Sequence, residues 1–139
     1  MGTRLVALYL MLTGLAVAVY FIAVSWQYSG ADQPYPVEPY PVWEVLHWFM
    51  AAAILIALLS AFADKRRLGA TGEPREQLAV NALFYALLGV GLLFFRSWPS
   101  LLRGGEYDLL VWSSINMVLP VVLAAVGMRL WRGNHGKEH

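Results

Sequence analysis

The sequence contains no cysteine among its 139 residues, and charged side chains are scarce. Without cysteine the chain cannot form disulfides, thiolate zinc sites, iron–sulfur clusters or cysteine nucleophiles, and its redox compartment cannot be inferred. Charged residues make up only 14% of the chain and hydrophobic residues 59%. Soluble domains have about 25% charged and about 45–50% apolar residues, so this composition is typical of a membrane protein.

Motifs for enzymatic chemistry are also missing. The sequence has no phosphate-binding glycine loop, no HExxH zinc motif, no nucleophile elbow and no paired carboxylates. Its polar C-terminal tail is short and weakly basic, which does not suit nucleic-acid recognition. We therefore expect no catalytic residues, no metal site and no nucleic-acid partner. The chain is not expected to be an enzyme itself, although it could be a subunit of a membrane enzyme complex.

The hydrophobic residues are gathered into four blocks. A helix of about 20 apolar residues crosses the hydrocarbon layer of a bilayer, and we expect spans at residues 5–25, 42–63, 78–95 and 109–130. The polar segments are two outer loops at 26–41 and 96–108, an inner loop at 64–77 and an inner tail at 131–139. The sequence predicts an all-α membrane protein in which residues 1–139 form one domain, a four-helix antiparallel up-and-down bundle.

Lys and Arg are distributed unequally along this arrangement. Eight of the ten lie at the N-terminus, in and around the 64–77 connection, or near the C-terminus, and only Arg96 and Arg103 lie in the other loops. Loops rich in Lys and Arg stay in the cytoplasm. We therefore expect a multi-pass protein of the inner (cytoplasmic) membrane with both termini in the cytoplasm.

Small residues recur at helical spacing in three of the predicted spans. They are Gly14 and Ala18 in the first, Ala53, Ala57 and Ala61 in the second, and Ala82, Ala86 and Gly89 in the third. Helices in lipid associate through small residues, which allow their backbones to approach closely. These seams suit packing within the bundle, and they suit docking onto other membrane subunits equally well.

Four side chains near the outer ends of the spans are candidate ligand-binding residues. Glu44, His47 and Trp48 lie in the first turns of the second span, and Asn116 enters from the same side in the fourth. Glu44 and His47 are three residues apart and share a helical face, so Glu44 can orient the imidazole. Ionisable groups near membrane depth are functional candidates. The alternative is that these side chains only bond to loop backbone or join helices.

The two halves of the sequence share a pattern that relates His47 to Asn116. The second span opens with Val42-Trp43-x-x-x-His47 and the fourth with Val111-Trp112-x-x-x-Asn116. A duplication would place the two polar residues at equivalent depths. Tryptophan recurring wherever a span enters the interface would produce the same pattern.

Several functions are compatible with these polar residues near the outer ends of the spans. A haem with two axial histidines from this chain is excluded, because His47 is the only histidine outside the tail. No cofactor is predicted, but a quinone, a lipid or a haem shared with another chain stays open, as does a small homo-oligomeric transporter. The function that the sequence favours is a non-catalytic accessory or structural subunit of a larger membrane complex. Its expected partners are the lipid bilayer and other membrane subunits.

Overall fold

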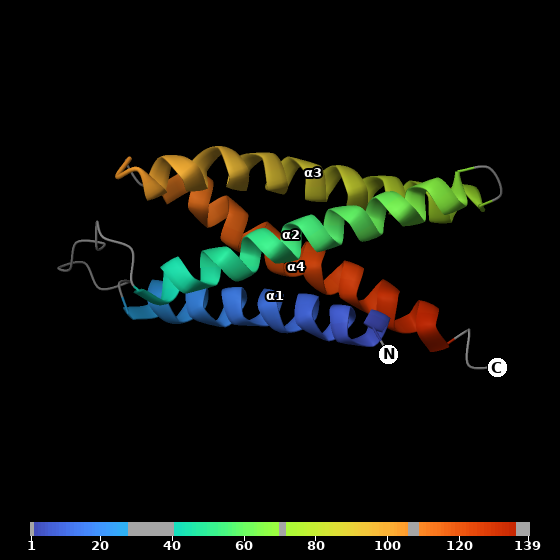
Figure 1. The fold of residues 1–139 in the computed structure, drawn as a ribbon, viewed down its shortest axis with the longest axis horizontal. Coiled ribbons are helices and arrows are strands. Elements are labelled where there is room, and N and C mark those ends of the chain that lie inside the picture. The colour runs from blue at the N-terminus through green and yellow to red at the C-terminus, as the bar shows by residue number, and fades with distance from the viewer. Residues whose placement is uncertain (1, 28–40, 70–71, 106–108, 136–139) are drawn as a thin grey trace.

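The computed structural model describes residues 2–27, 41–69, 72–105 and 109–135 as four helices with short connections (Figure 1). The helices are α1 (Gly2–Gln27), α2 (Pro41–Leu68), α3 (Pro74–Leu102) and α4 (Leu109–His135). Each contains a stretch that is long and apolar enough to cross a membrane. The predicted all-helical architecture with four membrane-spanning candidates is therefore confirmed for the described residues.

Successive helices run in opposite directions (Figure 1). The start of α1, the end of α2, the start of α3 and the end of α4 lie at one end of the molecule, which we call the terminal end. The opposite end is called the loop end. Helix α4 crosses the molecule diagonally, from α3 at the loop end to α1 at the terminal end. As a result, α1 packs mainly on α4, and α2 packs mainly on α3.

The helices are longer than the predicted spans at the terminal end. Helix α2 continues to Leu68, α3 begins at Pro74, and α4 reaches His135, so the 64–77 connection and the 131–139 tail are partly helical. Lys and Arg are good helix formers, and their long stems let the charged heads reach water. Proline is favoured in the first turn of a helix, where its missing N–H would have no partner anyway.

Helix α3 also extends past its predicted end at the loop end. It continues through Pro99, although the proline removes the hydrogen bond that an N–H would donate to the Phe95 carbonyl. The helix ends where the Arg103 N–H donates to the carbonyl oxygens of Pro99 and Ser100, both at 3.2 Å. Gly104 follows with φ +81°, a conformation that glycine adopts without steric cost. The loop predicted at 96–108 is helical over its first half.

Two of the three small-residue seams lie inside the bundle. The alanines of α2 are buried, with Ala53 and Ala57 fully inaccessible and Ala61 4% exposed. Gly14 of α1 lies so close to α4 that a Cβ there would be 3.2 Å from the Pro120 carbonyl oxygen. Small residues at these positions allow the helix backbones to pack closely.

The third seam faces away from the bundle. Ala82, Ala86 and Gly89 of α3 are all exposed, and a Cβ at Gly89 would meet no atom within 4 Å. The buried face of α3 lies on its other side and includes Leu87, Val90 and Phe94. The structure therefore assigns this seam no partner among the described helices.

Candidate functional site

His47 is enclosed by aromatic rings in the loop-end half of the molecule. Its imidazole, from α2, stacks on Trp112 of α4 with ring centroids 4.7 Å apart and 29° between the planes. Phe94 of α3 meets the imidazole at 6.1 Å in an edge-on arrangement. His47 is only 3% exposed and Trp112 2%. Three helices thus contribute one ring each to a closed contact, which fixes the orientation of the histidine.

The aromatic packing continues along α3. Phe94 lies 5.8 Å from Trp112 and 5.4 Å from Trp98, measured between ring centroids. Phe94 and Trp98 are four residues apart, so they share a face of α3. We call His47, Phe94, Trp98 and Trp112 the aromatic cluster. Tilted and edge-on rings at these distances are favourable arrangements for π systems.

Asn116 lies one turn beyond Trp112 on α4, on the same buried face. It is 2% exposed, and its side-chain oxygen Oδ1 accepts no hydrogen bond from the described residues. A buried polar atom without a partner costs about 1–3 kcal/mol. The Asn116 carbonyl oxygen is therefore suited to accept a hydrogen bond from an O–H or N–H group that reaches the bundle interior.

Glu44 and Trp48 do not join His47 and Asn116 in the interior. Glu44 is exposed, and Trp48 is 63% exposed, with its ring edge-on to Trp98 at 4.7 Å. The four residues expected at the outer site are thus divided into a buried pair and an exposed pair. Sequence reasoning missed the rings that surround His47, although the four-residue spacing between Phe94 and Trp98 is visible in the sequence.

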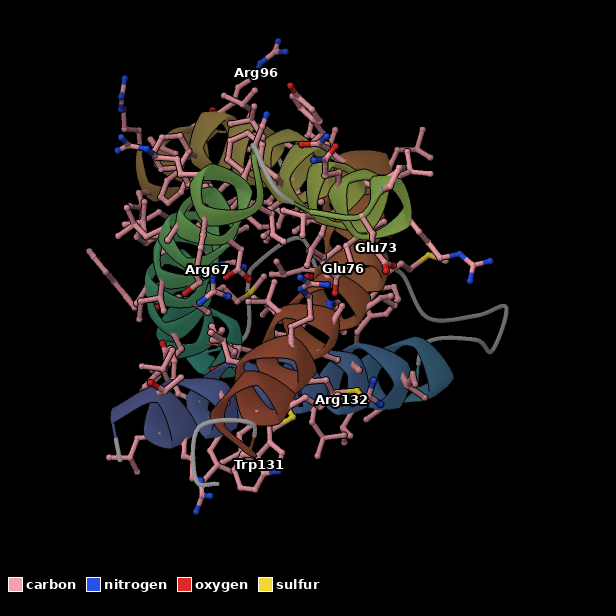
Figure 2. The ribbon with its side chains drawn as sticks, turned by 90° about the vertical axis from the view of Figure 1, so that its right-hand side faces the viewer. Arg67, Glu73, Glu76, Arg96, Trp131 and Arg132 are labelled. Atoms are coloured by element: carbon pink, nitrogen blue, oxygen red, sulfur yellow. The ribbon has the colours of Figure 1, made fainter. Side chains whose placement is uncertain are left out.

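A second polar site lies at the terminal end, where the four helix ends meet. A cavity of about 430 Å³ opens there. Its polar lining residues are Thr3 of α1, Asp64 and Arg67 of α2, Glu76 of α3, and Arg129 and Arg132 of α4. Figure 2 looks onto this end and shows Arg67, Glu76 and Arg132 on the three helices around it. We call this space the terminal cavity.

The carboxylate of Asp64 forms ion pairs with two of the arginines of the terminal cavity. Arg67 Nη2 donates a hydrogen bond to Asp64 Oδ1 at 3.4 Å, and Arg129 Nε lies 3.9 Å from Asp64 Oδ2. The second contact joins α2 to α4. From the sequence, this charged segment indicated mainly the orientation of the protein, with electrostatic recognition of anionic lipid as the alternative. The contributions of α1 and α4 could not be read from it, because they depend on how the helices pack.

The described side chains do not form a metal site. Among the residues whose side chains the structure describes, no three of His, Asp or Glu gather closely enough to hold a metal ion. Comparison of the chain with protein-family models, curated proteins and solved structures found no match.

Proposed function

We propose that the protein is a non-catalytic accessory or structural subunit of a larger complex in the inner membrane. The observation that carries this proposal is the outward seam of α3, formed by Ala82, Ala86 and Gly89. The small-residue seams of α1 and α2 already pack within the bundle. The seam of α3 has the same composition and spacing but lies on the outside.

The outward seam has the spacing of a helix–helix contact. Its residues are followed on the same exposed face by Leu93 and Arg96, in alternating steps of four and three. This 3.5-residue repeat keeps one line of side chains facing a neighbouring helix that crosses at a shallow angle. Small residues give a close backbone approach to a neighbouring helix. A span of another subunit is therefore the occupant that suits this face.

The distribution of charge supports the proposed orientation, with both termini in the cytoplasm. The terminal end carries Lys65, Arg66, Arg67, Arg75, Arg129 and Arg132, and this surplus favours the cytoplasmic side. Lys65 Nζ donates to the Tyr85 hydroxyl at 3.2 Å and lies 4.9 Å from the Phe84 ring centroid. A lysine that runs along aromatic surface toward a polar group is typical of the membrane interface.

Copurification tests the proposed role. The tagged protein would be extracted in a mild detergent, sized by gel filtration and examined by mass spectrometry. We expect a complex with other membrane subunits that is far larger than the 15.5 kDa chain. Elution of the wild-type protein as a lone monomer or homo-oligomer would overturn the proposal.

Leucine substitutions in the same experiment locate the contact. Ala86→Leu and Gly89→Leu add bulk at exposed positions, so they leave the bundle folded but prevent another helix from approaching. We expect these variants to lose the copurifying subunits. Ala16→Leu on α1 is the matched control, because Ala16 is also an exposed small residue but lies on a helix remote from α3. Retention of the partners by Ala86→Leu and Gly89→Leu would show that a different face makes the contact.

The buried amide of Asn116 favours a second candidate, a membrane subunit that binds a small molecule near the outer leaflet. The unpaired Oδ1 would accept a hydrogen bond from a quinol or from a hydroxyl or amine of a lipid head group. Solvent extraction of the purified protein followed by mass spectrometry would detect such a ligand. We expect Asn116→Leu and His47→Ala to reduce the amount retained. If both variants retain as much ligand as the wild type, this candidate fails. The absence of visible absorbance from the purified protein would exclude a shared haem.

A further inference from the structure

The terminal cavity carries more positive than negative charge. Three arginines and two carboxylates line it, so its formal charge is +1. Asp64 is shared by Arg67 and Arg129, and the Asp64 side chain is only 23% exposed. Among the described residues, Arg132 makes no ion pair within 4.0 Å, although Glu76 lines the same cavity. Within the described part of the chain, an anion entering the cavity would therefore meet the Arg132 guanidinium, which has no carboxylate within 4.0 Å, and the guanidinium groups of Arg67 and Arg129, which share Asp64.

The arginines surround the space from two helices. Arg129 and Arg132 are three residues apart and thus on one face of α4, and Arg67 approaches from the end of α2 (Figure 2). A guanidinium group donates two parallel hydrogen bonds to two oxygens of a phosphate, and such charge-assisted pairs are among the stronger hydrogen bonds in proteins. The three guanidinium groups that line the cavity therefore offer several donors to the oxygens of a phosphate group.

The start of α1 adds further donors beside the cavity. Helix α1 begins at Gly2, so Thr3 belongs to the first turn, in which the backbone N–H groups have no partner within the helix. The Thr3 hydroxyl can also donate. Helix N-termini attract anions, and here this effect acts together with the arginines. The volume of about 430 Å³ lies within the range of about 300–1,000 Å³ that is usual for small-molecule sites.

From this geometry we propose that the terminal cavity binds a phosphate ester, with Arg132, Arg129 and Arg67 as its ligands. The terminal end carries the Lys and Arg surplus and lies beyond the apolar spans, at the level of lipid head groups. The phosphate can thus come from an anionic phospholipid or from a soluble phosphate ester. This proposal does not depend on the role of α3 in subunit contacts, because the cavity and the outward seam are different surfaces.

Binding would be measured on the full-length protein in a neutral detergent by isothermal titration calorimetry. The probes are a short-chain phosphatidylglycerol, a short-chain phosphatidylcholine and glycerol 3-phosphate. We expect phosphatidylglycerol to bind more tightly than phosphatidylcholine. Equal binding of glycerol 3-phosphate would identify a soluble phosphate ester as a sufficient ligand, whereas weaker binding would identify the lipid. Failure of both phosphatidylglycerol and glycerol 3-phosphate to bind would overturn the proposal.

Single substitutions assign the binding to the cavity. Arg132→Gln should weaken binding about tenfold, because it removes a charge-assisted hydrogen bond. Asp64→Asn should strengthen binding, because it frees Arg67 and Arg129 from their shared carboxylate. Arg66→Gln is the matched control, since Arg66 adjoins Arg67 on α2 but does not line the cavity. An equal loss of affinity in Arg66→Gln and Arg132→Gln would show non-specific charge attraction and would refute the site. Thermal melting of each variant confirms that it is folded.

Discussion

Trp112 links three helices at the loop end and is the largest fully buried side chain of the described core. Its ring contacts His47 of α2 and Phe94 of α3. We expect Trp112→Ala to lower the free energy of unfolding by about 3 kcal/mol, because the bundle loses these contacts and gains a cavity. Unfolding in mixed micelles, followed by near-ultraviolet circular dichroism, measures the change.

Trp48 provides the matched control for Trp112. It is also a tryptophan at the loop end, but 63% of it is exposed, and its ring meets that of Trp98 with 85° between the planes. We expect Trp48→Ala to cost much less than Trp112→Ala in the same assay. Equal losses in the two variants would contradict the arrangement of the aromatic cluster.

Asn116 combines deep burial with a side-chain oxygen that accepts no hydrogen bond from the described part of the chain. Leucine has the same branching as asparagine and no polar atoms, so Asn116→Leu removes the unpaired oxygen without leaving a hole. We expect the melting temperature to stay unchanged or rise. Asn116→Asp should instead destabilise the protein by about 3 kcal/mol, because it places a carboxylate in the apolar interior. A large loss of stability in Asn116→Leu would show that the amide makes a bond that the fold needs.

The sequence predicts how deep in the spans the candidate outer site lies, but it does not predict which side of each helix is buried. His47 and Asn116 stand out because they are polar residues in apolar blocks. A span that is apolar on all sides gives no amphipathic pattern to tell its buried face from its lipid-facing one. For this reason, residue spacing does not predict that His47 is buried while the adjacent Trp48 is exposed. Ligand binding by these residues stays a prediction.

At the scale of the helices, the sequence predicts their number and approximate positions, because hydropathy and length decide both. It does not predict that α1 packs mainly on α4. That pairing depends on close contacts between residues far apart in the chain, such as Gly14 with Pro120. The seams of small residues show which positions allow a close approach, but they do not specify the partner helix.

Gly127 of α4 provides a test of the α1–α4 contact. A Cβ there would lie 2.6 Å from Met11 Cγ and 3.0 Å from the Ala7 carbonyl oxygen. The methionine can move, but the carbonyl belongs to the backbone of α1. We expect Gly127→Ala to force the helices apart and to destabilise the protein by about 1–3 kcal/mol. Thermal unfolding in detergent measures the effect.

Gly89 of α3 is the matched control for Gly127. A Cβ at Gly89 would meet no atom within 4 Å, so Gly89→Ala adds only helix propensity, up to about 1 kcal/mol. We expect the melting temperature of this variant to be equal to or above that of the wild type. If Gly127→Ala were as stable as Gly89→Ala, the close approach of α1 to α4 would be wrong.

At the scale of the molecule, the described residues include two polar levels that differ in character. The terminal cavity is open and charged, whereas His47 and Asn116 at the other level are enclosed by packed side chains. Between these levels the core is lined mainly by apolar residues, among them Ile54, Leu119 and Leu123. This separation agrees with the proposed accessory role better than with a polar pathway through the bundle, which needs polar groups at intervals across the layer.

The absence of cysteine allows the proposed orientation to be tested without background labelling. Ser100→Cys introduces one thiol at an exposed position near the loop end of α3, and Gly133→Cys introduces one at an exposed position at the terminal end of α4. The excess of Lys and Arg at the terminal end predicts that this end faces the cytoplasm. A membrane-impermeant maleimide added to spheroplasts should therefore label Ser100→Cys at once and Gly133→Cys only after the membrane is opened. The reverse pattern would invert the proposed orientation, and immediate labelling of both thiols would show that the bundle does not span the membrane.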